Sequence, residues 1–396
     1  MFPSKGRDSP SIFLYWSGLT RLSAIVNKNV LLLMAIVVLM LFLSSGPISG
    51  LVQREVYKPA GGWHIDAKGQ RPPRGIAIDS SGHIYLADAL NDRIQKLTPE
   101  GKLILEWGST GRKIGQFWVP AAIAVDLKRG AYVVDHDNNR VQRFDSNGTF
   151  IMSWGSEGAG EGKFLSPEGI AVDTNGGIYV VESTAHRVQK FTEGGRFITK
   201  WGSLGEEDGQ FAFPNAIAVD FLRSAVYVVD SGNYRIQKFT TQGEFIRKWG
   251  SFGTLEGKFT SPNGIAVDSD GNVYVLDAGN NRIQKFNLSG QFMTAWDVGS
   301  PGPELLGGMT IDVNGTIYLV DAANNSIRKY ARYGFEPVTI APSSKGDLKA
   351  AETIQGAQTN TPNQLIGPDS TEILTILLIG LAILVSIIVF QIKRKR

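Results

Sequence analysis

The sequence predicts an all-β fold, a six-bladed β-propeller of four-stranded blades, because three residue series recur with one period. The first series is an Asp that ends an apolar strand: Asp79, Asp126, Asp173, Asp220, Asp268 and Asp312, in steps of 47, 47, 47, 48 and 44 residues. The second is a turn residue: Arg93, Arg140, Arg187, Arg235 and Arg282, with Ser326 in the sixth place. The third is Trp63, Trp107, Trp154, Trp201, Trp249 and Trp296. A period near 47 residues is typical of one propeller blade.

Each copy is interpreted as four strands, and residues 262–286, PNGIAVDSDGNVYVLDAGNNRIQKF, show the pattern. GIAVD is the first strand, NVYVLD the second after a Gly-containing turn, and NRIQKFN the third. GQFMTAW is the fourth, and a Gly-rich return such as WGSFGTLEGKF leads to the next blade. The 46 Gly residues agree with many turns between short strands. The six blades occupy roughly residues 55–340.

The position of the Trp series predicts how the ring closes. Trp63 precedes the first blade, whereas the sixth blade ends in RYGFEPVTI without a Trp. The simplest closure therefore pairs the Trp63 strand with the sixth blade. In the alternative, residues 335–340 supply that strand and Trp63 packs elsewhere. The chain has no Cys, so closure cannot depend on a disulfide.

The C-terminal region predicts a transmembrane helix. Residues 373–390 are 18 residues without a charge, which span ~27 Å as a helix, close to a bilayer core of ~30 Å. A basic tail, residues 391–396, follows this helix, and Asp369 and Glu372 precede it. The positive-inside rule then places the C-terminus in the cytoplasm. Residues 342–371 are polar, with scattered Pro and Gly, and are expected to form a flexible stalk.

The N-terminal residues 1–45 are expected to be a cytoplasmic leader with a signal peptide or signal anchor. Their apolar core, residues 30–43, is 14 residues long, which suits a signal-peptide core better than a full span. Whether the segment is cleaved stays open. Either outcome places residues 46–371 outside the cell, so the expected location is the cell membrane, with the propeller on the outer side.

Charge and composition exclude several functions. The formal charge is +3, but each terminal segment (1–45 and 372–396) holds four basic and one acidic residue, so 32 basic and 35 acidic residues lie between them. A net charge of −3 gives no electrostatic bias toward nucleic acid, and no nucleic-acid partner is expected. Without Cys there is no thiol nucleophile, thiolate metal site or Cys-rich zinc domain.

The pattern PxGIAVDxxGxxYVxDxxNxRIQKF resembles the blade of the NHL repeat family and extends over about 70% of the chain in consecutive copies. Two blades depart from it. Glu182 and Ala185 replace Asp and Asn in the third blade, and Ser326 replaces Arg in the sixth. The resemblance implies a six-bladed propeller. Among proteins it resembles are zinc lyases, ubiquitin ligases and RNA binders.

Residues that recur in every blade are interpreted as structural, because a catalytic site needs its groups only once. The Asp that ends each first strand is expected to accept hydrogen bonds from turn amides. The turn Arg is expected to pair with an Asp five residues earlier, since its planar fork matches a carboxylate. The structural turn residues are Asp88, Arg93, Asp135, Arg140, Asp230, Arg235, Asp277 and Arg282.

Ligand-binding candidates lie where the copies differ. If the loops entering the first strands share a face with those joining the second to the third, as in proteins this one resembles, the channel is ringed by Arg74, Ala121, Glu168, Asn215, Asn263 and Gly307. Outside them stand His136, Asp137, Ser183, Thr184 and His186. Trp118 is the one propeller Trp outside the repeat series, and is either an aromatic ligand platform or a locally packed loop residue.

No catalytic residue is assigned, since the sequence has no Gly-x-Ser-x-Gly, phosphate loop or His-Glu-x-x-His motif. The sequence predicts a membrane-tethered module that acts in recognition or as a scaffold through its variable loop face, with an extracellular protein, peptide or glycan as its ligand. The alternative is a lyase or hydrolase at the channel mouth. No cofactor is expected, although His136 and His186 with Asp137 and Glu168 form an alternative metal site. Sequons at Asn147, Asn287, Asn314 and Asn324 are glycosylation candidates.

Overall fold

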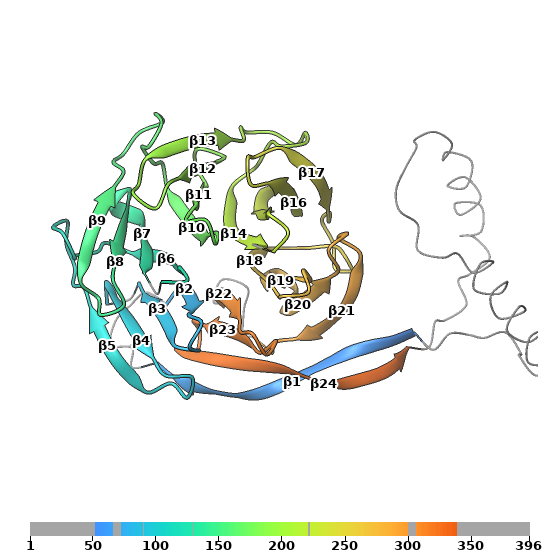
Figure 1. The fold of residues 1–396 in the computed structure, drawn as a ribbon. Helices are drawn as coiled ribbons and strands as arrows, with labels where there is room; N and C mark the ends of the chain where they lie inside the picture. The colour runs from blue at the N-terminus through green and yellow to red at the C-terminus, as the bar shows by residue number, and fades with distance from the viewer. Residues whose placement is uncertain are drawn as a thin grey trace, which may run out of the picture. The chain divides into compact units, whose positions relative to one another are not determined.

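A computed structural model describes residues 52–65, 73–89, 91–128, 130–220, 222–299 and 306–338. Within these ranges the chain forms six four-stranded antiparallel sheets arranged around an axis, each sheet being one blade (Figure 1). The predicted six-bladed all-β propeller is therefore confirmed. The predicted N-terminal segment 30–43, the stalk 342–371, the helix 373–390 and the tail 391–396 lie outside the described residues. Among the described residues no helix is long and apolar enough to cross a membrane.

Five blades are continuous in sequence. Blade 1 is β2 (Gly75–Ile78), β3 (Ile84–Asp88), β4 (Arg93–Leu97) and β5 (Leu103–Trp107). Blade 2 is β6 (Pro120–Val125), β7 (Ala131–Asp135), β8 (Arg140–Phe144) and β9 (Phe150–Trp154). Blade 3 is β10 (Pro167–Val172), β11 (Ile178–Glu182), β12 (Arg187–Phe191) and β13 (Phe197–Trp201). Blade 4 is β14 (Pro214–Asp220), β15 (Ala225–Asp230), β16 (Arg235–Thr240) and β17 (Phe245–Trp249). Blade 5 is β18 (Pro262–Val267), β19 (Val273–Asp277), β20 (Arg282–Phe286) and β21 (Phe292–Asp297).

Blade 6 joins the two ends of the described chain. Its inner strands are β22 (Leu306–Ile311) and β23 (Ile317–Asp321), followed by β24 (Ser326–Val338) and then β1 (Val52–His64) at the outer edge. Trp63 pairs with Ile327, and the two long strands run side by side from there to the pair Val52 and Val338 (Figure 1). The predicted closure through the Trp63 strand is confirmed, and the alternative through residues 335–340 is wrong.

The strands follow from their side-chain pattern. The second strand of each blade, such as AYVVD in β7, is buried at every position because it lies mid-blade with a neighbouring blade on each face. The fourth strand, such as FITKW in β13, alternates between half-buried and exposed residues, as the outer edge of a sheet does. The apolar core is consequently divided into layers between blades.

The Trp series fills these layers. Trp107 of blade 1 packs on Tyr85 of its own blade and on Phe144 of blade 2. A Cβ placed on Gly148, in the last turn of blade 2, would lie 2.9 Å from the Trp107 ring. Trp63 has the same relation to Gly101, so the seam between blades 6 and 1 packs like the others. This packing closes the ring without covalent links.

Candidate functional site

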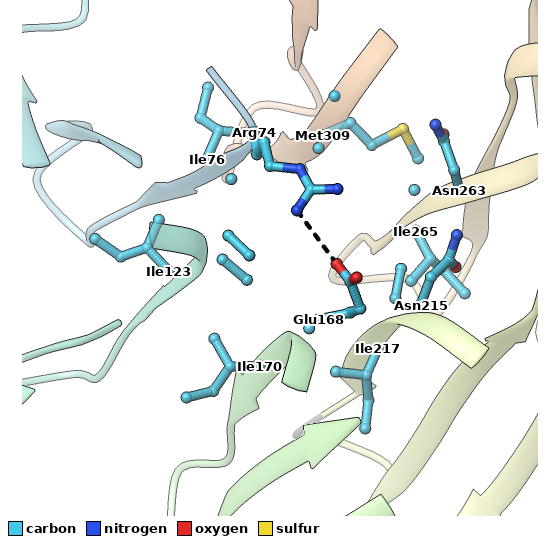
Figure 2. A pocket seen from close by; sticks show the side chains of 18 of the residues that line it. Arg74, Ile76, Ile123, Glu168, Ile170, Asn215, Ile217, Asn263, Ile265 and Met309 are labelled. Carbon is cyan, nitrogen blue, oxygen red and sulfur yellow. Dashed lines mark ion pairs between the residues drawn. The ribbon is translucent and has the colours of Figure 1, made fainter. Parts of the chain in front are cut away.

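The first strands of the six blades surround a central cavity of about 340 Å³. Its mouth is formed by the six variable positions, which the structure brings to one ring: Arg74, Ala121, Glu168, Asn215, Asn263 and Gly307. Two residues further along each strand lies an apolar ring of Ile76, Ile123, Ile170, Ile217, Ile265 and Met309 (Figure 2). A polar mouth over an apolar wall is a usual design for a ligand pocket.

The mouth is crossed by an ion pair between blades 1 and 3. Arg74 Nη1 lies 3.5 Å from Glu168 Oε2, a long contact for an ion pair (Figure 2). The Arg74 side chain is 43% exposed and the Glu168 side chain is 22% exposed. Arg74 therefore keeps N–H donors that can reach a ligand in the cavity, while Glu168 is held from two sides.

The second partner of Glu168 is His136, in the 3₁₀ turn η1 (His136–Asn138) of blade 2. His136 Nε2 lies 3.2 Å from Glu168 Oε1, and its Nδ1 lies 2.7 Å from Asp137 Oδ1. The hydrogen bond to Glu168 raises the pKa of His136, with burial opposing it and Asp137 adding to it. The imidazole is thus inclined to carry a proton, and His136, Glu168 and Arg74 form a charged chain over three adjacent blades.

A hollow of about 350 Å³ lies outside the mouth, beside His136 and Asp137. Trp118 lines it and is 38% exposed, while its backbone N–H donates to Asp135 at 2.7 Å. The Arg112 guanidinium lies 5.1 Å from the centroid of the Trp118 ring. Trp118 is held in place by its backbone, and its side chain remains partly exposed, as an aromatic platform requires.

A second hollow lies on the other side of Glu168, over blade 4. It is lined by Glu168 and Asn215 of the mouth and, further out, by Phe213 and Tyr234. Phe213 is 59% exposed. Sequence reasoning missed this residue, although a signal exists, because the corresponding positions of blades 3 and 5 hold Ser166 and Ser261.

His186 does not join His136 at the mouth. Its Nδ1 accepts a hydrogen bond from the Phe213 backbone N–H at 3.1 Å, and its ring meets the Phe213 ring edge-on. Asp92 and Asn139 make the same link to the next blade through their side-chain oxygens. The described residues contain no group of three or more His, Cys, Asp or Glu side chains that could hold a metal ion.

The remaining candidates lie on the same face. Thr184 is exposed and its hydroxyl donates to Ser166 Oγ at 3.0 Å. Asn215 donates weakly to the Pro262 carbonyl at 3.5 Å, and its buried Oδ1 has no hydrogen-bond partner among the described residues. Among the sequons, Asn147 and Asn314 are exposed and Asn287 is half-buried, whereas the Asn324 amide, which would carry a glycan, donates to Asp321 at 2.8 Å.

The repeated turn Asp and Arg residues pair with one another. The Asp–Arg distances are 2.8 Å for Asp88–Arg93, 2.7 Å for Asp135–Arg140, 2.6 Å for Asp230–Arg235 and 3.1 Å for Asp277–Arg282. In the departing blade 3, Glu182 pairs with Arg187 at 2.7 Å. In blade 6, where Ser326 replaces the Arg, Arg328 contacts the buried Asp321 instead. Both departures therefore keep a buried carboxylate paired.

Comparison with known proteins agrees with this geometry. The sequence model of the NHL repeat matches residues 164–191 and 259–286, which contain the first three strands of blades 3 and 5. The chain carries NHL repeats. No curated protein sequence matches this NHL propeller.

Solved structures share the propeller fold at low identity. A protein of unknown function from Bacteroides thetaiotaomicron is 18% identical, with a TM-score of 0.54, over 72% of this chain and 76% of its own. A catalytically inactive virginiamycin B lyase from Staphylococcus aureus with quinupristin is 17% identical, with a TM-score of 0.52, over 73% and 90%. A gluconolactonase from Xanthomonas campestris is 14% identical, with a TM-score of 0.51, over 70% and 99%. These similarities support the fold and leave binding and catalysis both open.

Proposed function

We propose that this NHL propeller is a recognition module that binds an extended peptide or glycan across its channel mouth. The observation that carries the proposal is the charged chain of Arg74, Glu168 and His136, which crosses the mouth between two hollows. Each hollow holds an exposed aromatic ring, Trp118 on one side and Phe213 on the other. Central polar groups would orient the ligand, and the rings would supply apolar contact at either end.

Membrane tethering is part of this proposal. The apolar segments 30–43 and 373–390 support it, together with the basic residues after the second. The pairing of Val52 with Val338 also supports it, because the chain enters and leaves the propeller at one end of the β1–β24 ribbon. Digestion of intact cells with an external protease tests this location. The proposal requires the propeller to be cleaved, and full protection would contradict it.

Binding is tested with the full chain on peptide and glycan arrays, followed by titration of the strongest binder. The double substitution Trp118→Ala with Glu168→Gln removes one ring and the central carboxylate, and we expect binding to weaken at least tenfold. The matched control is Ile114→Ala with Glu161→Gln. Ile114 is 65% exposed and the Glu161 side chain 59% exposed, and neither lines the cavity. Equal weakening by both pairs would contradict the proposal.

A second candidate, a lyase or hydrolase at the same mouth, is favoured by one observation. The His136 imidazole is hydrogen-bonded to Glu168 beside the cavity, and this bond raises its pKa, which suits a general acid. Metal analysis of the purified chain separates the candidates. Stoichiometric zinc that is lost in His136→Ala would favour a metal-dependent enzyme over a recognition module.

A further inference from the structure

Blade 4 carries an unusual row of side chains across its sheet. Tyr227 on β15 lies opposite Lys238 on β16, which lies opposite Arg247 on β17. Residues directly opposite in an antiparallel sheet share a face, so the two cations are neighbours. The Lys238 ammonium lies 5.1 Å from the centroid of the Tyr227 ring. Like charges opposite one another destabilise a sheet, so this row favours a counterion.

A third cation reaches the same place from the turn between β14 and β15. Arg223 Nη1 lies 3.3 Å from Asp220 Oδ2 and donates to the Ser269 carbonyl of blade 5. A Cβ placed on Gly271 would lie 2.8 Å from Arg223 Nη1, so the guanidinium bridges blades 4 and 5. Arg223, Lys238 and Arg247 are called the blade 4 cation cluster below. Asp220 is the carboxylate that offsets part of its charge.

The charges of the cluster lie close enough to act on one another. Burial lowers the pKa of Lys238, and repulsion by Arg247 and by Arg223 lowers it further, against the opposing effect of Asp220. Arg247 and Lys238 donate to the backbone carbonyls of Ser289 and Leu288, which neutralise no charge. Three cations and one carboxylate leave a local charge of about +2, which suits a dianion.

The hydroxyl of Tyr227 gives an independent indication. Tyr227 is fully buried, and its hydroxyl has no hydrogen-bond partner among the described residues. In the five other blades the corresponding hydroxyl donates to the Asp that ends the first strand: Tyr85, Tyr132, Tyr179, Tyr274 and Tyr318. In blade 4 that Asp, Asp220, faces Arg223 instead. A buried hydroxyl without a partner is costly, and an anion bound beside the cations would accept a hydrogen bond from it.

The corresponding rows of four other blades lack the second cation that blade 4 has. The residue opposite the central cation is neutral in the four other blades where this pair is described: Leu105, Met152, Thr199 and Thr294. In blade 2 the central Arg143 has a carboxylate partner, since it donates to Glu193 at 2.5 Å. Lys285 of blade 5 likewise contacts Glu55. Blade 4 has a second cation, Arg247, where these four blades have a neutral residue.

We propose that the blade 4 cation cluster binds one phosphoryl or sulfate group, with the Tyr227 hydroxyl as a further donor. The remaining N–H groups of two guanidinium groups and an ammonium supply charge-assisted hydrogen bonds to its oxygens. The site lies at the Asp220 end of β14, whereas Asn215 at the other end faces the channel mouth. It is therefore separate from the proposed recognition site and does not depend on it.

The test is the melting temperature of the full chain against inorganic phosphate, with chloride keeping the ionic strength constant. Ligands that bind only the folded state raise Tm. We expect phosphate to raise Tm of the wild type, and Arg247→Thr to need at least tenfold more phosphate for the same rise. Thr occupies this position in blades 3 and 5, so the variant should fold. Lys248→Thr is the matched control, because Lys248 points to the opposite sheet face and pairs with Asp208 at 2.8 Å.

Tyr227→Phe tests the hydroxyl separately. Because this hydroxyl has no internal partner and its burial is costly, we expect a Tm without phosphate that is equal to or above that of the wild type, and about threefold weaker phosphate binding. Tyr179→Phe is its control, since that hydroxyl donates to Asp173 at 2.8 Å; it should lower Tm without changing the phosphate response. The proposal is overturned if phosphate raises Tm no more than chloride, or if Lys248→Thr loses the response as fully as Arg247→Thr.

Vesicles identify the source of the anion. Flotation with phosphatidic acid in phosphatidylcholine, compared with phosphatidylcholine alone, measures recognition of a lipid phosphate. Loss of flotation in Arg247→Thr would assign the site to a lipid headgroup. A phosphate response without flotation would assign it to a soluble phosphoryl or sulfate compound.

Discussion

The repeated turns and the channel mouth use the same residue types to opposite effect. In the turn of blade 4, Arg235 donates to Asp230 and to three backbone carbonyls of the preceding return loop, and its side chain is 7% exposed. At the mouth, Arg74 has one long contact to Glu168 and is 43% exposed. Paired Arg and carboxylate groups therefore hold the blades in one region and remain accessible to a ligand in the other.

The difference shows where sequence variation is informative. A turn must be closed in every blade, so its residues recur, and even the departures in blades 3 and 6 keep the buried carboxylate paired. A ligand needs its contacts once, so the six mouth positions differ from one another. Four predictions test this difference, and the one with the largest expected effect comes first.

Arg235→Ala should cause the largest loss. It leaves the fully buried Asp230 carboxylate without its cation and removes one donor from each of three carbonyls, so we expect the free energy of unfolding to fall by about 3–5 kcal/mol. Arg74→Ala should lower it by less than ~1 kcal/mol, because its contact with Glu168 is long, 3.5 Å, and its own side chain is 43% exposed. Denaturant unfolding measures both values. Similar losses for the two variants would contradict the view that the turn Arg stabilises the fold while the mouth Arg does not.

Arg328→Ala tests whether blade 6 has a substitute for its missing turn Arg. Arg328 contacts the buried Asp321 and donates to the Gly299 carbonyl at 2.8 Å, and its side chain is 26% exposed. We expect a loss of about 1–3 kcal/mol in the free energy of unfolding, because the buried Asp321 carboxylate keeps its hydrogen bonds from Asn324 but loses its cation. Ser326→Ala, in the position that the repeat gives to Arg, is the control. A larger loss for Ser326→Ala than for Arg328→Ala would contradict the idea that Arg328 takes the role of the missing turn Arg.

His136→Gln should lower the free energy of unfolding by about 1 kcal/mol at low pH, and by less as the pH rises. The hydrogen bond to Glu168 raises the pKa of His136, so folding favours the protonated form. The stabilisation is complete below the unfolded pKa of about 6.5 and is lost as the pH rises through the raised folded pKa. The wild type should therefore exceed the variant in free energy of unfolding at about pH 5.5 and match it near pH 9. A difference that grows with pH would contradict the assignment.

Gly101→Ala concerns the seam that closes the ring. Gly101 has φ +87°, and its Cβ would lie 2.4 Å from the Trp63 ring, so we expect a loss of about 1–3 kcal/mol. Gly115→Ala has φ +73° and nothing within 4 Å of its Cβ, so only backbone strain of ~1 kcal/mol remains. Thermal unfolding compares the two. Equal losses of stability in the two variants would mean that close packing of Trp63 on Gly101 does not contribute to the stability of the seam.

Much of the fold could be predicted from the sequence, because the same strand and turn residues recur in each blade. The recurring Asp, Arg and Trp residues predicted six blades. Trp63, which precedes the first blade, predicted the strand that closes the ring. The ring of six variable residues also followed, since equivalent positions in a propeller lie around its axis. Contacts between side chains of different blades could not be predicted in this way. The Arg74–Glu168 pair across the channel, for example, is known only from the structure.

Three features had a sequence signal that a search for motifs overlooks. Phe213 stands in place of a Ser, Arg247 in place of a neutral strand residue, and Arg223 in a turn that elsewhere contains Gly. Each is a departure from the repeat rather than a part of it. His186 shows the converse error, because its position was taken for a variable rim residue although the same position links neighbouring blades in three copies.

Hydrogen exchange of the full chain, with and without the strongest array binder, tests whether the ligand binds at the channel mouth. We expect slower exchange in the loops around the mouth, residues 112–119, 136–139 and 183–186, and unchanged exchange in the turns at the opposite end, residues 145–149 and 192–196. Protection confined to those opposite turns, with no change around the mouth, would contradict the claim that the variable mouth is the recognition site.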